Sequence, residues 1–356
     1  MNYYLTKTRF NSSSWAKPLF FRRATLFGQR FRPTKVLGVE FHNKPYCGAR
    51  KPVSHTVLAK DGHPLRVWEK NVKQHTGKES SPHNQPKNAI LLLHGRTWSS
   101  LPVWDLHIPH SSSDDAPGGY NECLSFMDLL VESGYDAFAV DLRGFGETPL
   151  DGSMYLTPSK AVDDVHMVFQ WLRGAQGYDN PRPYLLGWSY GGLVAQLFAQ
   201  KYPDDISDLV LYGSAYDPST IFPRPSLTKR MDKPKLQQNT EEAAIEDFTL
   251  PGSICNKAAD AFAAAALASD PLKVIWSDLH EFNDLNAHHV HAPTLVIHGD
   301  MDPYTPIKAQ RKLFTNLAAS GDKVWQIIPY SDHCIHVLES RYKFLHGIMS
   351  FFERPK

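Results

Sequence analysis

The sequence predicts an α/β protein with a mostly parallel sheet flanked by helices. Short apolar runs recur along the chain, and segments with helical spacing of apolar residues lie between them. The runs show no alternation of polar and apolar residues, which is typical of strands buried on both faces of a parallel sheet. The chain has 356 residues, of which 42% are hydrophobic and 21% charged. This composition is that of a globular protein with a full core.

The first two strands are predicted on either side of Asp61-Gly62. This dipeptide is a strong hairpin signal because both central residues of the tight turn need positive φ. It separates residues 54–60 from residues 63–72. We therefore expect an antiparallel hairpin that leads into the sheet.

Six further strands and five helices are predicted after the hairpin. The strands are expected at residues 89–93, 137–140, 184–186, 209–211, 295–297 and 324–328. The helices are expected at residues 121–133, 159–172, 193–202, 306–317 and 341–352. Repetition of strand and helix predicts a parallel sheet with right-handed crossovers.

The interval between residues 211 and 294 interrupts this pattern. It is about eighty residues long, far longer than an ordinary connection, and contains helical patterns at 241–247 and 258–268. Ligands of open α/β sheets bind at the carboxyl ends of the strands, where this segment begins. We expect residues 216–293 to form a helical cap and residues 54–215 and 294–356 to form the core. The alternative is a helical excursion that only extends the core.

Residues 1–53 are expected to form a basic N-terminal extension. Residues 1–39 contain repeated lysine and arginine, a run of three serines and no acidic residue. Such a composition is typical of a mitochondrial transit peptide, and the segment lacks the apolar stretch of a secretory signal. We expect an intracellular, cytoplasmic protein, or a mitochondrial one if the source is eukaryotic and this segment is a transit peptide.

Charge, hydropathy and cysteine content exclude several classes. The 38 lysines and arginines nearly balance the 37 aspartates and glutamates, which argues against a nucleic-acid binder. No run of eighteen apolar residues is present, so no membrane-spanning helix is expected. The four cysteines, Cys47, Cys123, Cys255 and Cys334, form no C-x-x-C pair and predict neither a disulfide scaffold nor a zinc ribbon.

The segment Gly187-Trp188-Ser189-Tyr190-Gly191 is a G-x-S-x-G pattern between a predicted strand and a predicted helix. A turn this tight requires glycine two residues before and after the serine, and it holds the serine in a strained backbone conformation above the sheet. The start of the following helix directs backbone N–H groups toward developing negative charge. Ser189 is therefore the candidate nucleophile.

A serine nucleophile needs a base, and the base needs an acid that orients it. Asp300 and Asp302 follow the strand at 295–297, and His333 follows the last strand. His336, three residues further on, is the local competitor. Because these residues follow carboxyl ends of strands, they are expected to converge above the sheet.

Five motifs in this order resemble those of the α/β-hydrolase superfamily. They are His94-Gly95 after the third strand, residues 141–146 after the fourth, the G-x-S-x-G turn after the fifth, residues 299–302 after the seventh and His333 after the eighth. The resemblance covers residues 54–355. It implies an α/β-hydrolase fold with a mostly parallel eight-stranded sheet, flanking helices and a helical cap.

The resemblance also implies roles for individual residues. In family members with this G-D-x-D pattern the second acid completes the triad, which corresponds to Asp302 here, with Asp300 bracing the turn. Asp217 is a rarer alternative. The oxyanion hole would consist of the backbone N–H of Tyr190 and that of Arg96, or of Thr97 if the loop shifts.

Aromatic residues near these motifs have two interpretations. Trp98, Trp104 and Trp188 could line a substrate pocket or pack the loop at 97–119 onto the core. Arg143, in the segment 141–146, is expected to be structural.

We therefore predict a serine hydrolase that cleaves a carboxylic ester or lactone of a small-molecule acyl substrate. Ser189 would form the acyl-enzyme, with His333 as general base and Asp302 as orienting acid, and no metal or organic cofactor is required. A C–C bond hydrolase, an acyltransferase or a peptidase would use the same triad. A non-catalytic ligand receptor on the same fold is a further alternative.

Overall fold

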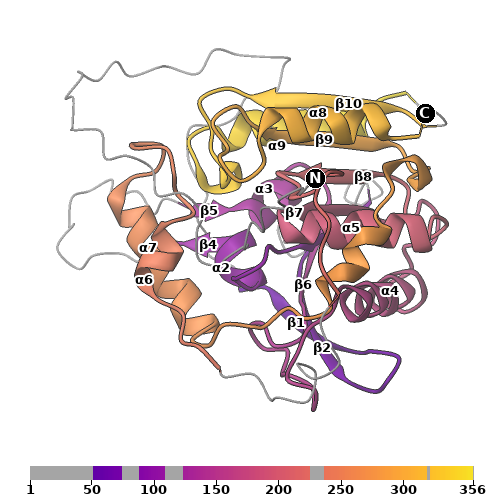
Figure 1. Ribbon diagram of the computed structural model, residues 1–356, viewed down its shortest axis with the longest axis horizontal. Helices are drawn as coiled ribbons and strands as arrows, with labels where there is room; N and C mark the ends of the chain where they lie inside the picture. The colour runs from indigo at the N-terminus through magenta and orange to yellow at the C-terminus, as the bar shows by residue number, and fades with distance from the viewer. Residues whose placement is uncertain (1–50, 74–87, 109–122, 225–235, 319–320, 356) are drawn as a thin grey trace, which may run out of the picture. The chain divides into compact units, whose positions relative to one another are not determined.

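The computed structural model describes residues 51–73, 88–108, 123–224, 236–318 and 321–355. The predicted basic extension, apart from residues 51–53, lies outside the described residues. The organisation described below is that of residues 51–355 (Figure 1).

A single eight-stranded sheet forms the centre of this region. The strand order is β1-β2-β6-β3-β7-β8-β9-β10. The strands are β1 (Val53–Leu58), β2 (Pro64–Lys70), β3 (Ala89–Leu93), β6 (Asp136–Asp141), β7 (Tyr184–Trp188), β8 (Leu209–Tyr212), β9 (Thr294–Gly299) and β10 (Lys323–Ile328). The pairs β1–β2 and β2–β6 are antiparallel, and the other five pairs are parallel. The predicted hairpin and the mostly parallel eight-stranded sheet are confirmed.

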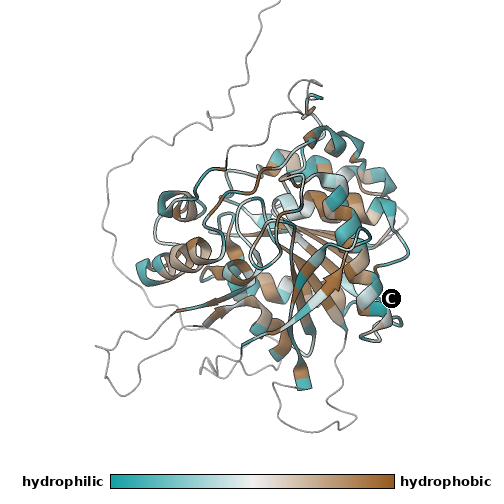
Figure 2. Cartoon of the chain, turned by 90° about the horizontal axis from the view of Figure 1, so that it is seen from below, coloured by the Kyte–Doolittle hydropathy of each residue, from teal (hydrophilic) through white to brown (hydrophobic). Residues whose placement is uncertain are grey.

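Helices cover both faces of the sheet. Along β3, Ile90 and Leu92 pack into one hydrophobic cluster while Ala89, Leu91 and Leu93 pack into another. The first cluster includes α3 (Phe126–Glu132) and α9 (Arg341–Phe352), and the second includes α4 (Pro158–Gly174), α5 (Tyr190–Lys201) and α8 (Ile307–Asn316). Figure 2 shows the hydrophobic residues concentrated on the strands between these helices. No helix of the described ranges has the length and apolarity needed to cross a lipid bilayer.

Helix α4 illustrates how local sequence sets an element boundary. The side chain of Thr157 accepts a hydrogen bond from the backbone N–H of Lys160, and Pro158 occupies the first helical turn. A threonine cap satisfies one of the unpaired N–H groups, and proline has no N–H to leave unpaired there. The helix therefore starts within one residue of the predicted position.

The region after β3 differs from the prediction. Residues 97–119 were expected to form a loop, but they contain helix α2 (Ser100–Trp104) and strand β4 (Asp105–His107). Strand β4 pairs with β5 (Cys123–Ser125), so the helix predicted from residue 121 begins only at Phe126, with Ser125 as its cap. Both expectations were wrong because strands of three residues are too short to show a period of two in the sequence.

The segment between β8 and β9 contains helices, as predicted. These are α6 (Glu241–Ile245), α7 (Asn256–Ser269) and the 3₁₀ helices η3 (Leu279–Asp284) and η4 (Ala287–His289). Helix α7 contacts α2 and β4, and Figure 1 shows α6 and α7 beside these two elements. We call residues 236–293 the insertion.

Candidate active site

Ser189 lies between β7 and α5 in a strained conformation. Its φ is 56° and its ψ is −117°, which is unusual for a residue other than glycine. Side chains at the flanking glycines would collide with the backbone: a Cβ on Gly187 would lie 2.6 Å from the carbonyl carbon of Gly191, and one on Gly191 would lie 2.7 Å from the oxygen of Leu93. The structure has the turn that the G-x-S-x-G pattern predicts.

His333 and Asp302 form a buried pair. The Nδ1 of His333 lies 2.8 Å from Oδ2 of Asp302. Asp302 also accepts hydrogen bonds from the backbone N–H groups of Tyr304 (2.9 Å) and Thr305 (3.1 Å) and from the hydroxyl of Thr305. With these donors and a carboxylate acceptor, His333 Nδ1 carries the proton and its Nε2 is left as the basic atom.

The charges of this pair shift both pKa values. Burial alone would lower the pKa of His333, but the carboxylates of Asp302, Asp247 and Asp332 outweigh burial and raise it above its ordinary value of 6.5. Burial alone would raise the pKa of Asp302, but His333 and the donors of Thr305 hold it below its ordinary value of 3.8. Asp302 is therefore ionised at neutral pH.

Contacts between strand ends place this pair near Ser189. The backbone N–H of Ser189 donates to the carbonyl of Tyr212 (3.0 Å), at the end of β8. A Cβ on the next residue, Gly213, would lie 3.2 Å from Nδ1 of His333 and 3.4 Å from Oδ2 of Asp302. The carboxyl ends of β7 and β8 and the loops after β9 and β10 therefore meet, as the order of the motifs predicts.

The competing residues have other partners. An oxygen of Asp300 accepts from the backbone N–H of Ser331 (3.2 Å), so Asp300 ties its turn to the loop that carries His333. Asp217 accepts from the backbone and hydroxyl of Ser219. His336 is buried and its Nδ1 lies 3.0 Å from the hydroxyl of Tyr212.

His94 orients the peptide that precedes Arg96. The backbone N–H of Leu142 donates to Nε2 of His94 (3.1 Å), so Nδ1 carries the proton and donates to the carbonyl of Gly95 (2.9 Å). Burial lowers the pKa of His94 to about 4, which keeps it neutral. In a planar trans peptide the carbonyl of Gly95 and the N–H of Arg96 point in opposite directions. The hydrogen bond that orients this carbonyl therefore also orients the Arg96 N–H. A Cβ on Gly95 would lie 3.4 Å from Cβ of Ser189, so this peptide borders the serine.

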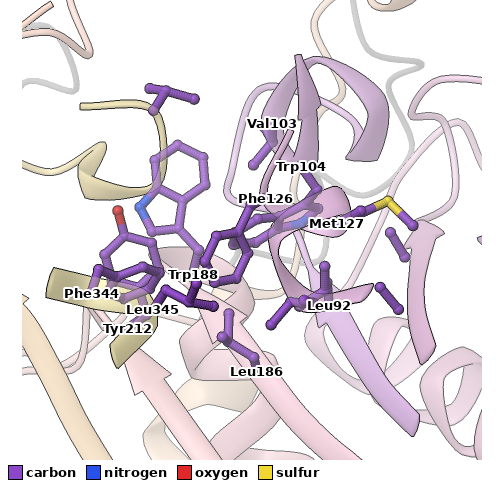
Figure 3. Packing of buried hydrophobic residues seen from close by; sticks show 14 of the residues in the cluster. Leu92, Val103, Trp104, Phe126, Met127, Leu186, Trp188, Tyr212, Phe344 and Leu345 are labelled. Carbon is purple, nitrogen blue, oxygen red and sulfur yellow. The ribbon is translucent and has the colours of Figure 1, made fainter. Parts of the chain in front are cut away.

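The other predicted oxyanion and pocket residues lie around the same turn. Tyr190 is the first residue of α5, and the guanidinium of Arg96 lies 5.1 Å from the centre of its ring. Thr97 follows Arg96 and is half-buried. Trp98, Trp104 and Trp188 are almost fully buried in the core, where Figure 3 shows Trp104 and Trp188 among leucine and phenylalanine side chains. Their predicted role in substrate binding remains a prediction.

The insertion contributes carboxylates that the sequence analysis did not single out. Asp247 accepts a hydrogen bond from Nε1 of Trp98 (3.2 Å), and burial raises its pKa to about 6. Asp270 accepts from the backbone N–H groups of Ser99 (2.7 Å) and Gly146 (2.8 Å). No local pattern distinguishes these residues from surface aspartates, because their partners lie more than a hundred residues away in the chain.

The core also contributes a carboxylate to the contact between the core and the insertion. Asp332, which precedes His333, accepts from the backbone N–H of Leu250 (3.1 Å) and from the hydroxyl of Ser253 (3.3 Å). Together with Asp247 and Asp270, it joins the insertion to the loops at the carboxyl ends of the strands.

A cavity of about 280 Å³ lies beside α5. Its walls include Leu193, Tyr216, Phe222 and Phe282, which are apolar or aromatic, and also Asp217. Leu193 lies one helical turn after Ser189, and the backbone N–H of Ala215, another wall residue, donates to the carbonyl of Ser189 (3.3 Å). The cavity therefore borders the serine turn on the side of β8.

One cluster of potential metal ligands occurs in the described ranges. Asp105, His107 and Asp128 have ligand atoms within 4.8 Å of one another. The ammonium group of Lys70 lies 2.6 Å from Asp105 and 2.7 Å from Asp128 and forms an ion pair with each carboxylate. Buried carboxylates with an ammonium partner are an ordinary structural ion pair.

Arg143 is structural, as expected. Its guanidinium donates to Asp164 (2.7 Å) and Asp61 (2.7 and 2.8 Å), which joins the segment after β6 to α4 and to the first hairpin. Cys334 is also buried.

Comparison with known proteins gives relatives among the hydrolases. Residues 119–341, more than half of the chain, match the family described as serine aminopeptidase, S33. The chain is 24% identical over 318 residues to lysophosphatidylserine lipase ABHD12 of Danio rerio, a match that covers 86% of this chain and 65% of that protein. It is 23% identical over 197 residues to protein ABHD8 of Homo sapiens, covering 52% and 43% of the two chains. The chain thus spans less than two thirds of the length of these relatives.

Solved structures agree on the fold. A thioesterase domain from the curacin biosynthetic pathway superposes with a TM-score of 0.55 at 13% identity, covering 84% of this chain and all of that one. An esterase from Thermogutta terrifontis superposes with a TM-score of 0.53 at 15% identity, covering 85% and 98%. With its family match and its eight-stranded sheet, the chain belongs to the serine aminopeptidase S33 family of α/β-hydrolases.

Proposed function

We propose that this hydrolase cleaves a carboxylic ester through an acyl-enzyme on Ser189, with His333 as general base and Asp302 as orienting acid. The observation that supports this most strongly is the set of contacts around Ser189. The Gly95–Arg96 peptide borders the serine, and the His333–Asp302 pair lies against the residue that follows β8. Nucleophile, base, acid and oxyanion donors are the parts that acyl transfer requires.

The proposed reaction has two steps. Ser189 Oγ attacks the acyl carbonyl while Nε2 of His333 takes its proton, and the backbone N–H groups of Tyr190 and Arg96 stabilise the oxyanion. The imidazolium then protonates the leaving alkoxide, which departs as an alcohol. Water attacks the acyl-enzyme with His333 as base, and the acid is released as Ser189 regains its proton. Asp302 stabilises the imidazolium in both steps.

The substrate class follows from the cavity and the relatives. The cavity beside α5 has mixed walls, in which Leu193 and Phe222 could receive an acyl group and Asp217 and Asn283 could receive polar groups of a small ester or lactone. The relative named lysophosphatidylserine lipase makes a lysophospholipid a rational member of the substrate panel. We propose that the insertion acts as a cap that closes over such a substrate.

An aminopeptidase activity is the second candidate, favoured by Asp247. Its carboxylate is close enough to His333 to raise the pKa of that histidine. A buried carboxylate beside the reacting centre suits a substrate with a free amino group. Asp247→Asn would then reduce cleavage of an aminoacyl anilide far more than cleavage of a simple aryl ester. Equal effects on both substrates would contradict this second function.

The first experiment requires no assumption about the acyl group. Purified protein is treated with a small fluorophosphonate and its intact mass is measured, with Ser189→Ala and His333→Ala beside it. We expect one adduct on wild type and none on either variant. His166→Ala is a matched control, because Nδ1 of His166 lies 2.7 Å from Oδ2 of Asp205 in a second histidine–aspartate pair. This variant should label like wild type.

Untreated wild-type protein would then be tested on esters, lactones, a lysophospholipid and aminoacyl anilides. A wild-type protein that forms no adduct and hydrolyses none of these contradicts the proposal. A non-catalytic ligand receptor would then be the better hypothesis.

A further inference from the structure

The main-chain carbonyl of His333 accepts two hydrogen bonds from side chains of the sheet. Nε1 of Trp188 donates to it at 2.9 Å, and the hydroxyl of Tyr212 donates at 2.8 Å. Figure 3 shows the indole nitrogen of Trp188 and the hydroxyl of Tyr212 directed to the same side of the cluster. A carbonyl oxygen has two lone pairs, so its hydrogen-bonding capacity is filled.

Both donors are rigid and belong to strands that carry the active site. Trp188 ends β7 and directly precedes Ser189, while Tyr212 ends β8 and directly precedes Gly213. The two rings are stacked, with centres 6.3 Å apart, and are 2% and 0% exposed. By contrast, the loop between β10 and α9 contains only the short 3₁₀ helix η5 (Ile335–Val337). The position of His333 therefore depends on contacts from outside its loop.

His336 fixes the hydroxyl of Tyr212. A phenol has one proton, and the proton of Tyr212 is used in the bond to His333. The Nδ1 of His336, 3.0 Å away, must therefore donate to the phenol oxygen, as does the backbone N–H of His336 at 3.4 Å. Burial lowers the pKa of His336 to about 3, so it remains neutral and keeps this arrangement at neutral pH.

We infer that Trp188, Tyr212 and His336 are positioning residues that hold the imidazole of His333 at a fixed distance from Ser189. The inference rests on the proposed function of Ser189 and His333. Because Trp188 is the residue next to Ser189, its hydrogen bond links the nucleophile turn directly to the backbone of the base. A displacement of the base by about 1 Å is enough to cost about a hundredfold in rate.

The test is the first-order rate of fluorophosphonate labelling in variants that remove the donors. Tyr212→Phe and Trp188→Phe should each slow labelling about tenfold, as expected for the loss of one hydrogen bond that positions a catalytic group. Because both bonds end on one oxygen, the double variant should differ from the product of the two single effects. For ester hydrolysis, kcat should fall while KM is unchanged. The pH midpoint of labelling should stay where it is in wild type, because the change affects position and not charge.

Tyr135→Phe is the matched control. Tyr135, the residue that precedes β6, is also buried. Its hydroxyl donates to Glu353 (3.4 Å) and not to His333. This variant should lose stability and keep its labelling rate. His336→Leu should slow labelling, and His336→Asn should restore part of the rate because its amide can again donate to Tyr212.

The outcomes separate this inference from the proposed function. If wild type is not labelled, the proposed function fails. If wild type is labelled and both Tyr212→Phe and Trp188→Phe label at the wild-type rate, only the positioning role is overturned. Loss of folding in both variants would also overturn it, because the two bonds would then support the fold and not the base.

Discussion

Two regions meet near the carboxyl ends of the strands, and different chemistry holds each of them in place. On the sheet side, contacts are made by glycines packed against backbone and by neutral donors such as Trp188 and Tyr212. On the side of the insertion, contacts are made by the carboxylates of Asp247, Asp270 and Asp332. The first set is neutral, and the second is charged.

This difference predicts a different response to pH. Neutral donors such as Trp188 and Tyr212 do not titrate near neutrality, so their hydrogen bonds are unchanged there. Burial raises the pKa of Asp247 to about 6 and also raises those of Asp270 and Asp332. A carboxyl whose pKa is raised in the folded protein destabilises it when ionised, and this destabilisation disappears as the pH falls through the raised value. We expect the attachment of the insertion to strengthen as the pH falls, while the serine turn keeps its shape.

The largest expected effect is at Asp302, the charged partner of His333. Asp302→Asn should lower the rate of labelling and ester hydrolysis about 10⁴-fold, because the imidazole loses its tautomer and its counter-charge. The measurement is the rate of fluorophosphonate labelling at a pH high enough that the rate no longer rises with pH. Asp300→Asn is the control. A rate close to that of wild type would mean that another carboxylate orients His333.

The same variant tests the linkage of this pair to stability. Because the pKa of Asp302 is lowered in the folded protein, its ionisation stabilises the fold when the pH is above the ordinary pKa of 3.8. Because the pKa of His333 is raised, its protonation stabilises the fold when the pH is below the ordinary pKa of 6.5. The difference in Tm between wild type and Asp302→Asn should therefore be greatest at about pH 4–6.5. It should shrink as the pH rises through the pKa of His333 or falls through that of Asp302.

A second prediction concerns the close approach of the serine turn. Gly187→Ala should lower the free energy of unfolding by about 3 kcal/mol or more, because the new Cβ meets the backbone of Gly191. Gly174→Ala is the control: no atom lies within 4 Å of the new Cβ at the end of α4, and this variant should be neutral or up to about 1 kcal/mol more stable. Urea unfolding measures both. Equal free energies of unfolding for the two variants would show that the turn is not tightly packed.

A third prediction concerns the insertion. Asp270→Ala leaves the backbone N–H groups of Ser99 and Gly146 without their acceptor. We expect a loss of about 2–6 kcal/mol in the free energy of unfolding, from about 1–3 kcal/mol for each of the two buried unpaired groups. Asp260→Ala, on the exposed surface of α7, should change it by less than about 0.5 kcal/mol. If Asp270→Ala were equally mild, the insertion would be held by its apolar contacts instead.

The smallest expected effect is a shift in a pH profile. The carboxylate of Asp247 raises the pKa of His333, so Asp247→Asn should lower it and move the rise of the labelling rate to lower pH. The plateau rate should change little, since the amide oxygen can still accept from Trp98. Glu246→Gln, at an exposed position next to it, should leave the midpoint in place. A midpoint unaffected by Asp247→Asn would remove this residue from the surroundings of His333.

Local sequence was sufficient for the eight strands of the main sheet, most helices and the serine turn. The run at 89–93 became β3 and the pattern at 341–352 became α9 with unchanged bounds. Each signal lies within a few neighbouring residues: apolar periodicity, a cap such as Thr157, or glycines on either side of Ser189. The chain therefore carries its fold class and its candidate nucleophile in patterns that can be read locally.

Only the tertiary structure decided how distant segments meet. It paired β4 with β5 and brought Trp188 and Tyr212 to the His333 carbonyl. It also brought Asp247 to Trp98 and Asp270 to the backbone of Ser99. These contacts join residues far apart in the chain, and hydrogen-bond geometry between such residues leaves no periodic trace in the sequence. Local patterns can specify elements, but the partners of a side chain depend on how the elements pack.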